Sequence, residues 1–140
     1  MADCLYACIG AFGLTLLSDF LLRESEKGGA KIVGMAQDWI AAHYREAASL
    51  QEAARAVSLN PSYFSTLLKK FTGKSYTELL MEYRIERAKE LLAGTDKKTY
   101  EIAEEVGFSG YKFFSVCFLR YEGCSARDYR NKCKEAKLSD

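Results

Sequence analysis

Residues 49–73 read SLQEAARAVSLNPSYFSTLLKKFTG, and residues 99–123 read TYEIAEEVGFSGYKFFSVCFLRYEG. The two stretches match at a shift of 49 positions in their first part and, after one extra residue in the second copy, at a shift of 50. The aligned pairs include Ala54 and Ala103, Val57 and Val106, Leu59 and Phe108, Phe64 and Phe114, Leu68 and Phe118, and Gly73 and Gly123. The chain therefore contains an internal duplication of a unit of about 25 residues.

Each copy begins with the pattern of a short helix. Ser49 and, three residues later, Glu52 fit a capping box, and Thr99 is expected to take the role of the cap in the second copy, with Ile102 in place of the glutamate. A helix of about two turns should follow. Its small alanine, Ala54 or Ala103, leaves room for the close approach of another helix.

A three-residue turn comes next in each copy, at residues 58–60 and residues 107–109. Its middle residue, Leu59 or Phe108, should fill the gap between two helices. Its last residue, Asn60 or Ser109, is expected to cap the second helix, and Pro61 suits the first turn of that helix, where a missing N–H costs nothing. Two short helices joined by such a turn make a helix-turn-helix.

The second helix of each copy has an apolar face and an outward face. We expect the buried positions to be Phe64, Leu67, Leu68 and Phe71, and in the second copy Phe114, Cys117, Phe118 and Tyr121. The expected outward positions are Ser62, Ser65, Thr66 and Lys69, and in the second copy Tyr111, Lys112, Ser115 and Val116. An outward face is usually only a solvated surface, but a face that recurs in two matched copies indicates a binding surface.

The remaining segments predict an all-α chain of two parts. Residues 76–92 have apolar residues at helical spacing and form a linker helix of about 26 Å between the two units, with Gly94 as its cap. A helix from Ile32 to His43 should bury Ile32, Met35, Trp39 and Ile40 on one side, after a polar linker over residues 24–31. We therefore divide the chain into two parts. Residues 1–30 hold an N-terminal apolar helix (residues 4–22) and its linker, and residues 31–140 hold the two helix-turn-helix units with the linker helix between them.

Composition excludes several classes of protein. The odd number of cysteines (Cys4, Cys8, Cys117, Cys124 and Cys133) and the absence of a C-x-x-C pair predict free thiols in a reducing cytoplasm. With one histidine, no nucleophile paired with a base and no phosphate-binding glycine loop, we expect no enzyme activity, no metal site and no cofactor. The net charge of +1 means that any nucleic-acid contact must come from locally placed cations.

Over residues 32–133 the chain resembles the AraC/XylS family of bacterial transcription regulators. The resemblance rests on Asn60-Pro-Ser-Tyr-Phe-Ser65, Phe71-Thr-Gly73, Arg84-Ile85-x-x-Ala88-x-x-Leu91-Leu92, Ile102-Ala103-x-x-Val106-Gly107-Phe108 and Gly123-x-Ser125 with Tyr129-Arg130. It implies two helix-turn-helix units that insert recognition helices into adjacent major grooves, about 34 Å apart, near a promoter. It also implies a cytoplasmic, nucleoid-associated regulator, an activator in our interpretation, with double-stranded DNA and RNA polymerase as partners.

Carried over to this chain, the family's base-contacting positions are Ser62, Ser65 and Thr66 in the first unit and Tyr111, Lys112, Ser115 and Val116 in the second. The positions expected to contact phosphates are Lys69, Lys70 and Arg120. Thr66 and Val116 stand where the family often has Arg or Lys, and Leu119 stands where Lys is common. Thr66 and Val116 therefore cannot make the bidentate contact with guanine that Arg makes.

Two questions stay open from the sequence. The low net charge leaves an alternative function, a protein-interaction module that keeps the fold with weak affinity for DNA. The apolar residues 4–22 are expected to support self-association or docking to a missing sensor domain; contact with a membrane is the less favoured alternative because Asp19 and several small polar residues interrupt the stretch.

Overall fold

The computed structural model describes residues 28–139, and every regular element among them is helical. Residues 28–43 form the first helical segment. The following helices are α2 (Leu50–Ala56), α3 (Pro61–Thr72), α4 (Tyr76–Gly94), α5 (Thr99–Glu105), α6 (Tyr111–Glu122) and α7 (Ala126–Ser139). Helices α2 and α3 make the first helix-turn-helix, and α5 and α6 make the second, which confirms the all-α fold and the duplication predicted from the sequence.

The first unit follows its sequence signals closely. The Ser49 hydroxyl accepts the Glu52 N–H at 3.2 Å, and the Asn60 side chain accepts the Ser62 N–H at 2.9 Å, so both expected caps are present. Pro61 is the first residue of α3. Phe64, which is fully buried, lies in a core that the first helical segment, α2, α3 and the start of α4 share.

The second unit has different caps from those expected. Lys98, and not Thr99, precedes α5, and its N–H donates to Glu101 Oε1 at 2.8 Å. Gly110, and not Ser109, precedes α6, and no side chain caps that helix. The extra residue in the second turn moves the start of α6 by one position, so Ser109 cannot take the place of Asn60.

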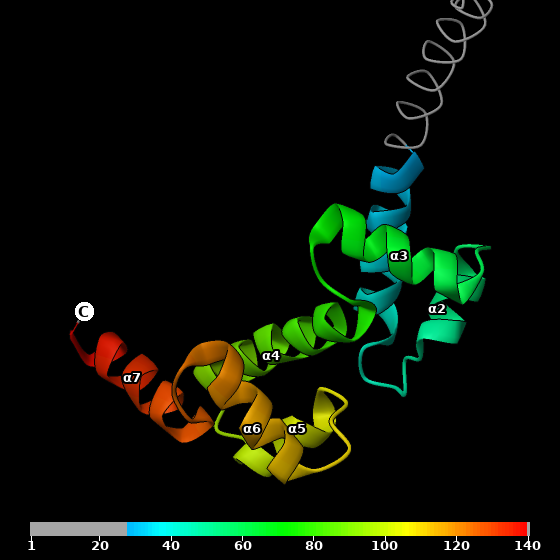
Figure 1. Cartoon of the computed structure of the whole chain (residues 1–140). Helices are drawn as coiled ribbons and strands as arrows, with labels where there is room; N and C mark the ends of the chain where they lie inside the picture. The colour runs from blue at the N-terminus through cyan, green and yellow to red at the C-terminus, as the bar shows by residue number, and fades with distance from the viewer. Residues whose placement is uncertain (1–27, 140) are drawn as a thin grey trace, which may run out of the picture.

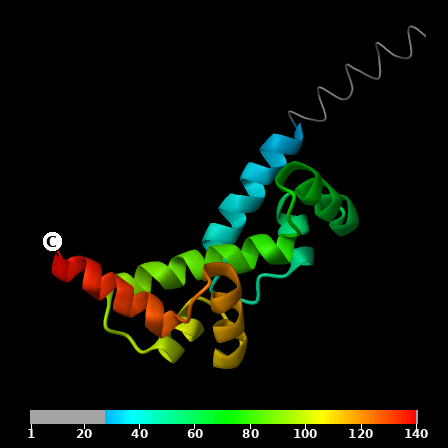
Figure 2. The same cartoon turned by 60° about the vertical axis from the view of Figure 1, so that its left-hand side comes forward.

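Helix α4 connects the two units. It begins with the Ser75 and Glu78 capping box and extends two residues beyond the predicted end, with Gly94 as its last residue and Thr95 as its cap. Its 19 residues give a length of about 28 Å at 1.5 Å per residue. Figures 1 and 2 show the first unit gathered at the start of α4 and the second unit, with α7, along its later part.

Two arginines bind backbone carbonyls and so join helices that a helix-turn-helix separates in the sequence. Arg84 of α4 donates to the carbonyls of Tyr44 (2.8 Å) and Glu46 (2.7 Å), just after the first helical segment. Arg130 of α7 donates to the carbonyls of Leu92 and Thr95, both at 3.2 Å, at the end of α4. Each unit thus uses the same contact: an arginine on the helix after the helix-turn-helix (α4 or α7) binds carbonyls at the end of the helix before the helix-turn-helix (the first segment or α4).

The first helical segment starts earlier than predicted. Residues 28–31, expected to belong to a polar linker, are already helical. Gly29 is buried, and a Cβ atom there would lie 2.1 Å from the Phe71 ring, so this glycine allows close packing on α3 and does not mark a linker. Met35, predicted to be buried, is 38% exposed, and Ala36 takes the fully buried position.

Part of the predicted architecture lies outside the described residues, namely the apolar helix at residues 4–22 and residues 24–27 of the linker. Within residues 28–139, no helix combines the length and the apolar character needed to cross a membrane.

Candidate nucleic-acid interface

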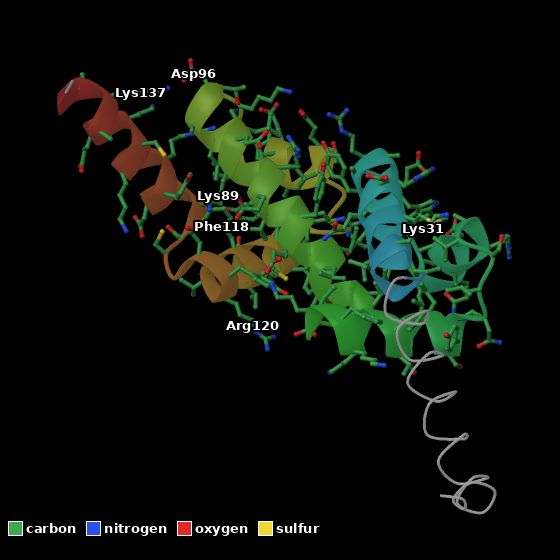
Figure 3. The ribbon with its side chains drawn as sticks, turned by 90° about the horizontal axis from the view of Figure 1, so that it is seen from above. Lys31, Lys89, Asp96, Phe118, Arg120 and Lys137 are labelled. Atoms are coloured by element: carbon green, nitrogen blue, oxygen red, sulfur yellow. The ribbon has the colours of Figure 1, made fainter. Side chains whose placement is uncertain are left out.

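The two recognition helices, α3 and α6, both pack against α4, with α3 near its start and α6 farther along it. In Figure 3 they line the same edge of the molecule, and Arg120 of α6 points outward from that edge. Buried aromatic residues fix each helix, since Phe64 of α3 and Phe114 and Phe118 of α6 are fully buried. This anchoring leaves the opposite face of each helix free for a partner.

The outward face of α3 carries all five first-unit residues predicted from the sequence. Ser65, Thr66, Lys69 and Lys70 line one open depression, and Ser62 is exposed one turn earlier. The Thr66 hydroxyl donates to the Ser62 carbonyl at 2.9 Å. Its oxygen can therefore still accept a hydrogen bond from a base, whereas its proton is already in use.

The outward face of α6 carries the second set. Lys112 and Val116 are exposed and Ser115 is half-buried. Tyr111 Oη accepts a hydrogen bond from the Thr99 hydroxyl at 3.2 Å, which lowers the pKa of Tyr111, and Ser115 contributes in the same direction. Tyr111 thus joins the start of α5 to the start of α6 while 46% of its surface stays accessible.

Arg120 and Lys69, one from each unit, come close to the same carboxylate. Arg120 lies near the start of α4, where its charge and that of Lys69 help the Ser75 hydrogen bonds to lower the pKa of Glu78. The sequence places Lys69 and Arg120 in separate units, 51 residues apart. The fold brings both near one carboxylate, at the junction between the two recognition helices.

The cations of this face form no ion pair with a carboxylate that the structure describes. Among residues 28–139, ion pairs use Lys74, Arg87, Lys89 and Lys97, and none of these pairs engages Lys69, Lys112 or Arg120. The positive charge that the net value of +1 conceals is therefore available on α3 and α6. A polyanion is the partner that such a face attracts.

The structure adds residues that sequence reasoning missed. Lys98, Thr99, Tyr100, Arg127, Arg130 and Asn131 line a hollow of about 450 Å³ beside the second unit. Arg127 also lies close enough to Tyr111 to lower its pKa. No local pattern marks Arg127, because it follows the helix-turn-helix in the sequence and reaches it only through the packing of α7.

Tyr121, expected to be buried, is 39% exposed, while Phe71, its counterpart in α3, is half-buried. Both lie in the last turn of a recognition helix, past the edge of the core. Cys117 is buried as expected, and Cys117, Cys124 and Cys133 are free thiols; Cys4 and Cys8 lie outside the described residues. No group of three or more potential metal ligands gathers in the described part of the chain.

Comparison with known proteins agrees with this architecture. A family model described as a helix-turn-helix domain matches residues 53–132. The transcriptional regulatory protein HptR of Staphylococcus aureus is 35% identical over 100 residues, which make up 71% of this chain and 38% of that protein. The chain thus spans little more than a third of the length of that relative.

Solved structures share the fold. The C-terminal domain of AraT, a response regulator from Geobacillus stearothermophilus, superposes with a TM-score of 0.69 at 34% identity, covering 72% of this chain and 84% of that one. The DNA-binding domain of AdpA, solved in complex with a target DNA, superposes with a TM-score of 0.68 at 22% identity, covering 80% and 97%. With its two helix-turn-helix units on a shared helix, the chain belongs to the AraC/XylS family of DNA-binding transcription regulators.

Proposed function

We propose that the chain binds double-stranded DNA sequence-specifically by inserting α3 and α6 into adjacent major grooves near a promoter. The observation that carries the proposal is the pair of anchored helices along one edge of the molecule, each with an exposed face whose cations form no ion pair with the described carboxylates. The length of α4, about 28 Å, is of the order of the ~34 Å between successive major grooves. The DNA complex of the AdpA domain supports the same partner.

The two recognition helices divide into base-contacting and phosphate-contacting positions. We assign base contacts to Ser62, Ser65 and Thr66 of α3, and to Tyr111, Lys112, Ser115 and Val116 of α6. Lys69, Lys70 and Arg120 are assigned to phosphates, because long cations at the flanks of a recognition helix reach the DNA backbone. Arg127 and Lys98, beside the hollow of the second unit, join this phosphate-contacting group.

Selection of bound sites from random DNA at about 50 mM salt, where attraction to phosphates is little screened, tests the proposed function. We expect an enriched motif with two half-sites, a half-site being the stretch of duplex that one unit contacts. Recovery of no enriched sequence, together with a stably folded protein, would contradict DNA binding. That result would favour the protein-interaction module that keeps the same fold.

Salt dependence tests the assigned charges. Each of Lys69→Ala and Lys112→Ala should weaken binding to the selected duplex and reduce the slope of log K against log salt by about 1. Lys134→Ala is the matched control, since Lys134 is exposed on α7 and lines a hollow at the far end of α4. Fluorescence anisotropy titrations at several salt concentrations measure these slopes. A slope unchanged from the parent in Lys69→Ala removes the phosphate assignment of Lys69, and an unchanged slope in Lys112→Ala removes the charged contact of Lys112 with the DNA.

Ser65→Ala separates base readout from charge. Ser65 is half-buried and lines the depression on α3, and its hydroxyl carries no charge, so the loss of that hydroxyl should leave the salt slope unchanged and relax the preference at one base position. Repeating the selection with the variant measures this effect. Identical motifs for the variant and the parent would show that Ser65 does not contact a base.

The consequence for transcription is also a proposal. We infer an activator that acts with RNA polymerase in the bacterial cytoplasm, at the nucleoid, and self-associates through residues 4–22. Transcription in vitro from a promoter carrying the selected site should increase on adding the protein; a decrease indicates a repressor. Light scattering of the chain with and without residues 1–27 tests self-association. A monomer mass for both chains would exclude it.

A further inference from the structure

Helix α6 exposes a strip of apolar side chains on its outward side. Phe113, Val116 and Leu119 are 48%, 64% and 55% exposed. They are spaced three residues apart, so neighbouring members lie side by side on the helix surface. Phe114 and Phe118 anchor α6 from the opposite side and are fully buried. Phe113 touches the edge of the core through the Phe108 ring, at 5.7 Å between centroids, and Val116 and Leu119 are the more exposed members of the strip.

The duplication shows what is particular to this strip. At the shift of 50 positions, Val116 corresponds to Thr66 and Leu119 corresponds to Lys69. Valine has the shape of threonine with a methyl group in place of the hydroxyl. At these two positions the outward face is therefore polar in the first unit and apolar in the second, although the two recognition helices share one fold.

The surroundings of the strip favour a ligand that is anionic overall and apolar locally. Lys112 and Arg120 lie within about one helical turn of Val116, on either side of it along α6, and neither forms an ion pair with a described carboxylate. DNA has this combination: phosphates flank the major groove, and the thymine C5-methyl group is the apolar group exposed on its floor. The strip has no amide or guanidinium group with which to read guanine or adenine.

We propose that Val116 is a specificity-determining residue of α6 and that, with Phe113 and Leu119 beside it, it contacts thymine C5-methyl groups in the second half-site. The inference rests on the proposed function, because it needs α6 to enter the major groove. The continuity of the strip with Lys112 and Arg120, on the face that the rest of α6 offers to DNA, favours this occupant over a second copy of the chain.

Uracil tests the proposal directly, because it differs from thymine only by lacking the methyl group. The site is first selected from random DNA with the parent protein and with Val116→Ala, and the thymine whose preference weakens in the variant marks the contact. Replacing that thymine by deoxyuridine in a labelled duplex should weaken binding of the parent about fourfold for each methyl group removed from the interface. Anisotropy titrations give the two affinities.

A double-mutant cycle assigns the effect to Val116. The thymine-to-uracil change should weaken binding of the parent and have little effect on Val116→Ala, whose side chain no longer reaches the methyl group. Val116→Thr keeps the shape and should lie between the two, since Thr66 shows that a threonine hydroxyl in this register donates to the carbonyl four residues earlier. Uracil placed outside the selected motif is the control duplex.

The outcomes are distinguishable. Failure to select any site contradicts the proposed function itself. A selected site in which no thymine preference depends on Val116, or an equal effect of uracil on the parent and on Val116→Ala, overturns the inference and leaves DNA binding intact. A Val116→Ala variant that binds the duplex like the parent and loses self-association in light scattering also overturns it, and identifies the strip as a protein interface.

Discussion

Arg84 joins the two units, and replacing it with Met should lower the free energy of unfolding by about 3 kcal/mol. Its side chain is 6% exposed and donates hydrogen bonds of 2.8 and 2.7 Å to the carbonyls of Tyr44 and Glu46. Its guanidinium also lies over the Phe108 ring, at 5.8 Å, and burial lowers its pKa. Hydrogen bonds from a charged group contribute about 1.5–3 kcal/mol each, and the methionine avoids part of the desolvation of a charge.

Urea unfolding followed by circular dichroism measures this loss. The matched control is Arg87→Met on the same helix, because Arg87 has a 40% exposed side chain and pairs with Glu90 three residues away, a contact worth at most ~1 kcal/mol. Arg84→Lys should fall between the two, since a lysine keeps the charge but cannot reach both carbonyls with the geometry of a guanidinium. A loss in Arg84→Met no larger than that in Arg87→Met would refute the role of Arg84 as the connection between the units.

Three further predictions concern single contacts. Ser58 has a left-handed φ of 60° and Gly107, its counterpart in the second unit, has φ 97°, so Ser58→Gly should stabilise the protein by about 1 kcal/mol in urea unfolding. Gly107→Ser should destabilise it by more than about 2 kcal/mol, because a Cβ there would lie 2.3 Å from the Tyr44 carbonyl oxygen; an opposite pair of signs would contradict this interpretation. The pKa of Glu78 is lowered by its hydrogen bonds with Ser75 and by nearby cations, so the ionised Glu78 stabilises the fold above the ordinary glutamate pKa of about 4.3, and this stabilisation is lost as pH falls. Melting curves from pH 3 to 7 should therefore show a smaller loss of stability toward acid in Glu78→Gln than in the parent. Parallel curves would exclude this contribution of Glu78. Tyr76→Phe should cost about 1 kcal/mol in the same urea assay, because the buried hydroxyl donates to the Ala48 carbonyl at 2.8 Å, and no loss would mean that water replaces this bond.

Local signals predict most of the fold, and they are wrong where a cap needs no side chain. Asn60 and Pro61 mark the start of α3 because the cap is made by a side chain that the sequence displays. Gly110 precedes α6 with no side-chain bond, so no capping side chain marks it in the sequence, and only the shift of 50 positions between the copies places it opposite Asn60. The predicted end of α4 is two residues early for a similar reason, since a glycine is as compatible with the last turn as with the cap.

Tertiary packing decides the other differences. Gly29 resembles a linker residue in the sequence, yet the Phe71 ring packs where its side chain would be, and only the fold reveals this contact. Tyr121 has the helical spacing of a buried residue, but α6 extends past the core before that position is reached.

The candidate interface divides in the same way. The exposure of Lys112 and Val116 follows from the period of α6 and is confirmed, whereas their contacts with bases remain predictions. The position of Arg120 near Glu78, and of Arg127 near Tyr111, depends on how α4 and α7 pack, and no local pattern in the sequence predicts it.

In the first unit, Arg84 of α4 donates to the Tyr44 carbonyl after the first helical segment, and in the second unit, Arg130 of α7 donates to the Leu92 carbonyl of α4. Helix α4 therefore belongs to both units. The two recognition helices therefore have a fixed separation and a fixed rotation relative to each other. Each base pair inserted between two half-sites rotates one of them by about 34° around the duplex axis, since B-DNA has about 10–10.5 base pairs per turn. The operator of this protein should accordingly tolerate changes of base sequence between its half-sites far better than any change in their spacing.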